Sequence, residues 1–150
     1  MKTFASPWDF SGDSRQFYAP DGLQYLRYET ESLTEIAMGG PLSGPCFWVR
    51  PDGTEVLLHE TCGGPPVWQR QGNYVALPIW QLSLSGGRKA CLGVVAITRC
   101  ELILFEEKFS VLQLEEFDDQ LIIGIESPIY RPKSLKFDLT SATVARIISL

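Results

Sequence analysis

A single histidine and its neighbours are the first residues in this chain that could carry out chemistry. His59 is the only histidine, and Cys62 follows it in a His-x-x-Cys arrangement. With Cys46, or with Cys91 and Cys100, these two residues could form a zinc site, because thiolate sulfur and imidazole nitrogen are common zinc ligands. The chain contains no Cys-x-x-Cys pair, however, and no G-x-S-x-G motif that would supply a nucleophile for a histidine base. We therefore expect a surface or strand-end histidine, no metal and no cofactor, and we keep His59 as a candidate binding residue.

Carboxylates gather in a second segment, where Glu115, Glu116, Asp118 and Asp119 surround Phe117. Two carboxylates can hydrolyse a glycosidic bond when they flank it across a cleft and one pKa is raised. Adjacent acidic residues in a turn are usually solvated, and such charges protect strand edges from aggregation. We interpret the segment as a solvated turn. As a functional site it favours a negatively charged knob for a basic partner over a carboxylate-based hydrolase.

Aromatic side chains form the third group, with 4 tryptophans, 5 tyrosines and 8 phenylalanines. Trp48, Trp68 and Tyr74 are candidates for stacking on a sugar ring or for contact with a protein partner. Large rings also suit a sheet, where they cover neighbouring strands. We expect about half of the tryptophans and their aromatic neighbours to lie in the core.

Two Gly-Gly-Pro segments, residues 39–45 and 63–66, each precede an aromatic element. Glycine-rich loops can bind phosphate through backbone N–H groups. A phosphate loop also needs a lysine and a helix N-terminus, which do not follow here, and the prolines remove donors. We expect connecting loops, with a binding rim as the alternative, because loops on a rigid sheet often carry function.

Charge and composition exclude several classes of function. The net charge is −5 and the isoelectric point is near 4.9. The 13 scattered Lys and Arg residues do not provide the positive surface that nucleic acids or anionic membranes require. No stretch reaches the length of a membrane span, and the N-terminus does not resemble a secretory signal. We expect a cytoplasmic protein whose four cysteines are buried free thiols.

Strands must position these residues, because helical periodicity is nearly absent. Three stretches, residues 17–26, 48–57 and 68–77, share one pattern: an aromatic residue, a tight glycine turn and an apolar strand. These units resemble the hairpins of β-propeller blades, but three unevenly spaced copies are too few for a closed propeller. Turn signals about every 8–12 residues are typical of a sandwich or barrel. The sequence predicts one all-β domain over residues 1–150, an antiparallel meander forming a sandwich or open barrel, with at most one short helix near the C-terminus.

Several segments carry more detailed expectations. Residues 23–37 predict one long strand or two strands with a bend near Glu31. Hairpins are expected around residues 51–53 and 85–88. The continuously apolar segment 89–98 predicts a central strand covered on both faces. Residues 141–150 predict a helix or turn followed by an edge strand, and further strands are expected at 101–106, 109–115, 120–125 and 134–139.

The function expected from these patterns is that of a small bacterial-type protein that binds another protein, such as an immunity or inhibitor protein that blocks a partner's surface. This expectation rests largely on elimination of the sites above. The alternative is a small-ligand or carbohydrate-binding β-barrel, and a homodimer through a sheet edge is a third arrangement. Whether the chain is an enzyme stays open, although the sequence favours a protein without catalytic residues. The candidate binding residues are Trp48, Trp68, Tyr74, His59, Glu115, Glu116, Asp118 and Asp119.

Overall fold

The structure, a computed structural model, describes residues 16–29, 32–35, 41–82, 87–127 and 131–150. Strands dominate these residues, and no α-helix occurs among them. In chain order the strands are β1 (Gln16–Tyr18), β2 (Tyr25–Tyr28), β3 (Thr34–Glu35), β4 (Leu42–Val49), β5 (Glu55–Cys62), β6 (Val67–Trp68), β7 (Tyr74–Leu82), β8 (Arg88–Ala96), β9 (Glu101–Phe109), β10 (Leu112–Asp118), β11 (Leu121–Glu126), β12 (Lys133–Asp138) and β13 (Val144–Ser149).

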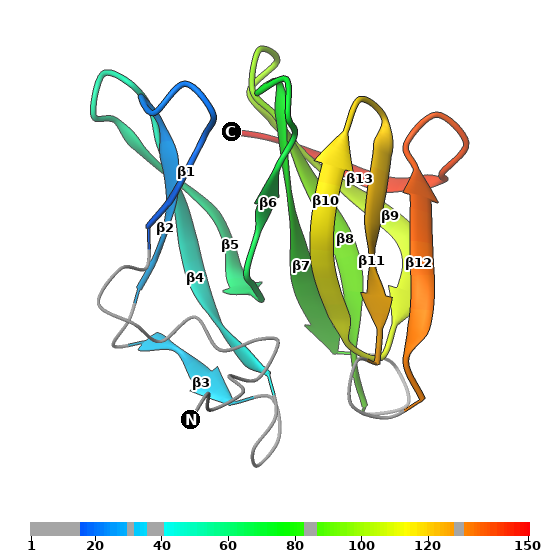
Figure 1. Ribbon diagram of the computed structural model, residues 1–150. Helices are drawn as coiled ribbons and strands as arrows, with labels where there is room; N and C mark the ends of the chain where they lie inside the picture. Colours follow the sequence, from blue (N-terminus) through cyan, green and yellow to red (C-terminus); the bar gives the residue numbers. More distant parts are fainter. Residues whose placement is uncertain (1–15, 30–31, 36–40, 83–86, 128–130) are drawn as a thin grey trace, which may run out of the picture.

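The strands form two antiparallel sheets arranged as three layers (Figure 1). The 10-stranded sheet has the order β1-β2-β4-β5-β7-β8-β9-β13, with β3 beside β4 and β6 beside β7. Strand β5 meets β7 at one pair, Cys62 and Ile79, and the sheet folds over at this point. Strands β1, β2, β4 and β5, here called the β1–β5 layer, therefore cover one face of the central meander β7-β8-β9. The 3-stranded sheet β10-β11-β12, the β10–β12 layer, covers the other face.

Two hydrophobic clusters lie on opposite faces of the central meander because side chains alternate along its strands. Val75, Leu77 and Ile79 of β7 pack toward the β1–β5 layer with Leu26, Trp48 and Leu58. The intervening positions pack toward the β10–β12 layer, where the cluster includes Ala76, Trp80, Leu92, Phe105, Phe109, Phe117, Ile122 and Phe137. Every residue of β8 from Ala90 to Ala96 is buried. The prediction of a central strand covered on both faces is confirmed.

The three glycine turns share one backbone geometry. Gly22, Gly53 and Gly72 have φ values of 70°, 88° and 83°, a region that glycine adopts without steric cost. In each turn the glycine N–H donates to the carbonyl oxygen three residues earlier, at Ala19, Arg50 and Gln69. The turns join β1 to β2, β4 to β5 and β6 to β7. All three predicted hairpin units are therefore confirmed.

The β10–β12 layer is attached to the central meander through two turns as well as through the core. The backbone N–H of Arg70, in the β6–β7 turn, donates to the carbonyl oxygen of Phe117 at 2.8 Å. The buried amide of Gln69 donates through Nε2 to the carbonyl oxygen of Asp119 at 2.7 Å. The neighbouring Gln71 bonds the side chain of Asp118 and the backbone of Asp119. These contacts fix the position of the β10–β11 turn.

The all-β antiparallel fold class is confirmed, with additional detail in two places. The segment 23–37 forms two strands, β2 and β3, although the expected bend at Glu31 lies outside the described residues. The C-terminal segment forms a turn followed by the edge strand β13, with no helix. Residues 85 and 86 of the turn expected at residues 85–88 lie outside the described residues, and the flanking strands β7 and β8 pair with each other.

Candidate interaction surface

The two candidate tryptophans hold the β1–β2 hairpin in place. Trp48 is 2% exposed, and its Nε1 donates to Oε1 of the buried Gln24 at 3.0 Å. Trp68 is half-buried, and its Nε1 donates to the carbonyl oxygen of Phe17 at 2.8 Å. The ring of Trp48 is therefore inaccessible to a partner, whereas Trp68 presents part of its ring to solvent.

The second Gly-Gly-Pro segment connects β5 to β6, at the place where the large sheet folds over. The N–H of Gly63 donates to the carbonyl oxygen of Pro78 at 2.8 Å, and its carbonyl oxygen accepts from the Tyr28 hydroxyl at 2.7 Å. A Cβ atom at this position would lie 2.7 Å from Nε1 of Trp80, so only glycine fits without a shift. In the first segment, Gly39 and Gly40 lie outside the described residues.

His59 is half-buried, and it is opposite Cys46 in the β4–β5 ladder. Its Nδ1 accepts from the backbone N–H of Thr61 at 3.1 Å. Burial lowers the pKa of His59, the charge of Glu60 opposes this effect, and Arg146 adds to it. Burial also raises the pKa of Cys62 well above its usual value, which keeps this thiol protonated. Within the described residues, no group of three or more His, Cys, Asp or Glu side chains is arranged to hold a metal ion.

The carboxylate segment lies on the exposed part of β10 and in the turn that follows. Glu115 and Glu116 are exposed, at a point where the β10–β11 register shifts. Asp118 accepts from Gln71 at 2.8 Å and lies 3.7 Å from Nη1 of Arg70, so its charge is partly used within the fold. The segment thus presents two free carboxylates on one strand.

A polar cleft of about 380 Å³ lies beside this turn. Tyr74, Asp119, Arg99 and Gln120 are among the residues that line it, and the ring of Tyr74 stacks on Phe117 at 6.2 Å between centroids. The structure therefore brings together two candidates that are distant in the sequence, Tyr74 and Asp119. Glu115 and Glu116 do not line this cleft.

A second hollow, of about 450 Å³, lies between the end of β9 and the β12–β13 turn. Its lining includes Glu106, Glu107, Lys136 and Asp138. Hydrogen bonds from Thr140 lower the pKa of Asp138. A lowered pKa is the opposite of what a general acid in glycoside hydrolysis needs, so Asp138 is unsuited to that role.

The outward face of the β1–β5 layer carries a surface that the candidate residues did not include. Strand registers place Tyr18 beside Tyr25 in one row across this face. The next row runs from Gln16 through Arg27 and Phe47 to Leu57. Tyr18 is 53% exposed and Leu57 is 41% exposed, and the rings of Tyr18 and Tyr25 lie 4.7 Å apart between centroids. We call the residues Tyr18, Tyr25, Arg27, Phe47 and Leu57 the aromatic face.

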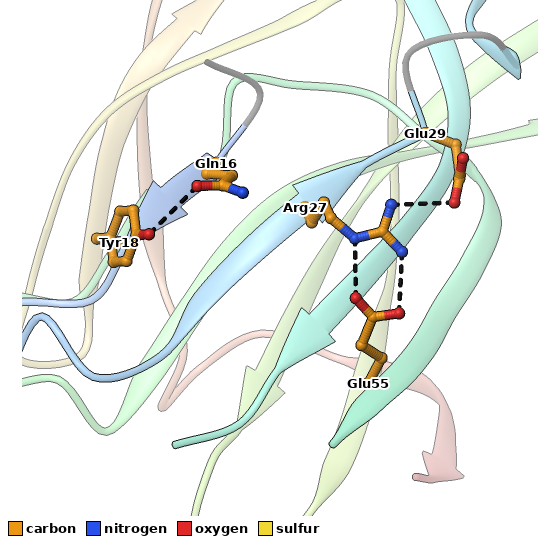
Figure 2. A network of polar contacts seen from close by, with 5 residues as sticks. All are labelled: Gln16, Tyr18, Arg27, Glu29 and Glu55. Atoms are coloured by element: carbon orange, nitrogen blue, oxygen red, sulfur yellow. Dashed lines mark hydrogen bonds and ion pairs between the residues drawn. The ribbon is translucent and has the colours of Figure 1, made fainter. Parts of the chain in front are cut away.

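Two carboxylates hold Arg27 of the aromatic face in place (Figure 2). Its Nε and Nη2 each donate to a different carboxylate oxygen of Glu55 at 3.1 Å, and its Nη1 donates to Glu29 at 3.0 Å. Its guanidinium carbon lies 4.6 Å from the centroid of the Phe47 ring. The hydrogen bond to Glu55 is the largest of the effects that raise the pKa of Arg27, so the group stays charged.

Sequence periodicity contained a signal for this face. Tyr25, Arg27 and Glu29 alternate along one strand and therefore point to the same side. The missing information was the pairing of this strand with β4 and of β4 with β5, which brings Glu55 to Arg27 across 28 residues of sequence.

The fold and this surface define a class: an all-β antiparallel protein of three layers, with an exposed aromatic face on one outer layer. Comparison with known proteins finds no matching family model, no matching curated protein and no matching solved structure. Among the described residues, no helix is long and apolar enough to cross a bilayer.

Proposed function

We propose that this chain is a protein-interaction module that binds its partner through the aromatic face. The observation that carries the proposal is a group of two tyrosines, a phenylalanine and a leucine around an arginine that is already fixed in place. Tyr18 and Leu57 of this group are exposed, and Tyr25 and Phe47 are half-buried. Tyrosine and arginine are enriched among residues that dominate binding energy at protein interfaces. A flat sheet surface of this kind suits an inhibitor or immunity protein, which acts by covering part of its partner.

Preorganisation of Arg27 supports the same proposal. A long side chain that is ordered only on binding costs about 0.5–1.5 kcal/mol in lost rotamer freedom. Arg27 already makes three hydrogen bonds to Glu29 and Glu55 in the free chain. Its planar guanidinium therefore offers a fixed, flat surface beside Phe47, and little of this ordering cost is left to be met on binding.

The charges around the aromatic face indicate the chemistry of the partner. Arg27 is balanced by Glu29 and Glu55, and the exposed turn residues Asp21 and Asp52 lie at the ends of the same layer. The rim therefore carries carboxylates, which surround the apolar side chains and the paired Arg27. The partner surface that fits has an apolar centre with Lys or Arg residues around it, because complementary charges speed association and exclude wrong partners.

A matched pair of leucine variants tests the proposal. Leu57 of the aromatic face is 41% exposed, and Leu121, on the outward face of the β10–β12 layer, is 37% exposed. We expect Leu57→Asp to abolish recovery of a partner protein from a host lysate, whereas Leu121→Asp recovers it as the wild type does. Mass spectrometry identifies the captured protein, and circular dichroism checks that both variants are folded. Equal recovery by both variants would remove the aromatic face from the proposal.

A second candidate function rests on the polar cleft at Tyr74. Side-chain amides, an arginine, a carboxylate and an aromatic ring line a volume of about 380 Å³, which is within the usual range for ligand pockets. Groups of this kind bind the hydroxyls and ring face of a sugar. Saturation-transfer NMR with a panel of oligosaccharides tests this candidate: a signal that Tyr74→Ala removes supports it, and no signal in the wild type excludes it.

A further inference from the structure

Strand β13 lies at one end of the large sheet and is largely exposed. Five of its six residues are exposed, and the Ile147 side chain is 55% exposed. One side of the strand pairs with β9. Among the residues that the structure describes, none pairs with the other side.

The register shows which backbone groups of β13 point outward. The N–H of Leu150 donates to the carbonyl oxygen of Cys100, so the backbone groups of Leu150 point toward β9. In an antiparallel ladder this direction alternates along the strand, and Ile148 therefore also points its backbone groups toward β9. Ile147 and Ser149 point their N–H and C=O groups away from the sheet.

Other sheet edges carry features that discourage pairing with a second chain. Strand β12 has Lys133 and Lys136, and β1 is three residues long. The stretch of β5 that does not pair with β7 contains Glu55 and Glu60. Charged residues and short length are the usual protection of edge strands. Along β13 the only charged side chain is Arg146, and residues 147–150 carry none.

We propose that the outward edge of β13 pairs antiparallel with β13 of a second copy of this chain, about a two-fold axis at Ile147. In this register Ile147 and its symmetry mate exchange both N–H···O=C bonds. The ladder of β13 is irregular between Val144 and Arg146, so the regular part of the pairing covers residues 146–148 of each copy. A two-fold axis requires that both copies use the same surface, and the same edge of β13 from each copy meets this requirement.

The distribution of charge makes the β13 edge a better binding site for a second copy than the other sheet edges. Each chain has a net charge of −5, so two copies repel wherever their acidic surfaces meet. In the proposed register β13 meets only β13 of the other copy, so no carboxylate side chains of the strand are brought together, and Arg146 of each copy faces Ile148 of the other. One strand pair buries little surface, so the dimer is expected to be weak and to depend on concentration.

The test uses the full chain and three substitutions at one position. The N–H of Ile147 points away from β9, so Ile147→Pro removes the donor in each copy, and with it both bonds at the axis, while keeping the β9 ladder. Ile147→Lys places like charges on the axis, and Ile147→Thr keeps both the N–H and a β-branched side chain. Analytical ultracentrifugation from about 5 μM to about 500 μM follows the mass of the 16.8 kDa chain.

We expect the wild type and Ile147→Thr to shift from monomer toward dimer as concentration rises. Ile147→Pro and Ile147→Lys are expected to stay monomeric over the same range, with thermal melting that shows they are folded. A wild type that stays monomeric throughout overturns the proposal. A dimer that persists in both the Pro and the Lys variants also overturns it, because that dimer forms through another surface.

Discussion

The β1–β5 layer and the β10–β12 layer cover opposite faces of the same central meander, but charged side chains are arranged differently on their outward faces. The β10–β12 layer places Ile123 between Glu116 and Lys136 on neighbouring strands. The long charged side chains of these neighbours flank the apolar stripe of β11. In the β1–β5 layer the charges instead pair with one another at Arg27, while Tyr18 is exposed and Tyr25 is half-buried.

Surface charges therefore have different roles in the two layers. Exposed apolar residues are ordinary on a protein surface, and flanking charges keep them soluble. Charges that neutralise one another do not flank the neighbouring rings in this way, and they hold one side chain in a fixed geometry. The second arrangement is the one expected of a surface that is covered by a partner, and the predictions below test whether the two layers differ as described.

The largest expected effect concerns the core beneath the β10–β12 layer. Phe137 is buried, and its ring contacts Phe105 and Phe109 at 5.1 Å and 6.5 Å between centroids. Phe137→Ala leaves a cavity and is expected to lower the free energy of unfolding by about 3–5 kcal/mol. Urea denaturation followed by tryptophan fluorescence measures this change. A loss below about 1 kcal/mol would mean that this layer contributes little to the folded state.

A smaller effect compares two buried glutamines, one for each outer layer. Gln24→Ala leaves the buried indole N–H of Trp48 without an acceptor, which is expected to cost about 1–3 kcal/mol. Gln69→Ala removes bonds to Asp119 and Asn73, two exposed residues whose backbone groups water can reach. We expect the second substitution to cost less than the first in the same denaturation experiment. The reverse order would contradict the assignment of Trp48 as an anchor.

A substitution at the centre of the aromatic face is expected to separate binding from stability. Arg27→Lys removes the two-point contact with Glu55 and the planar group above Phe47. Partly exposed ion pairs contribute about 0–1 kcal/mol, so the melting temperature is expected to change little. Recovery of the partner from lysate is expected to fall, whereas the matched variant Lys136→Arg in the other layer leaves it unchanged. Unchanged recovery with Arg27→Lys would show that this guanidinium is dispensable.

The smallest expected effect is the pH dependence contributed by His59. Its pKa in the folded chain is below the ordinary value of 6.5, mainly because of burial. Below about pH 6.5 the unfolded chain therefore binds the proton more readily, and the free energy of unfolding falls as the pH is lowered through the folded pKa. His59→Asn keeps an acceptor for the Thr61 N–H and has no such proton. Its stability is expected to fall less between pH 7.5 and pH 5.5, as measured by urea denaturation.

Local parts of this fold could be predicted from the sequence, whereas pairing between distant segments could not. The turns at Gly22, Gly53 and Gly72 need a left-handed backbone, and that requirement is visible in the residues themselves. The buried strand β8 could be read from its continuous apolar run. The return of β13 to the edge of β9 depends on contacts made across more than 35 residues, and no local pattern encodes it.

The candidate site was harder to predict for the same reason. Trp48 and Phe47 are adjacent aromatic residues, and alternation along β4 buries one ring and leaves the other on the outer face. The sequence alone does not say which face is inside. Tyr18, Arg27 and Leu57 become neighbours only when β1, β2, β4 and β5 are paired in this order.

The single pair that joins β5 to β7, Cys62 with Ile79, has a consequence for the motions of the molecule. Backbone hydrogen bonds are nearly absent at this boundary, so the β1–β5 layer is held to the meander by side-chain packing and by the tyrosine and tryptophan bonds across it. Cooperative units of a protein separate where few hydrogen bonds cross between them. The layer that carries the aromatic face is therefore expected to open as one unit, and its amide protons to exchange with solvent before those of β8.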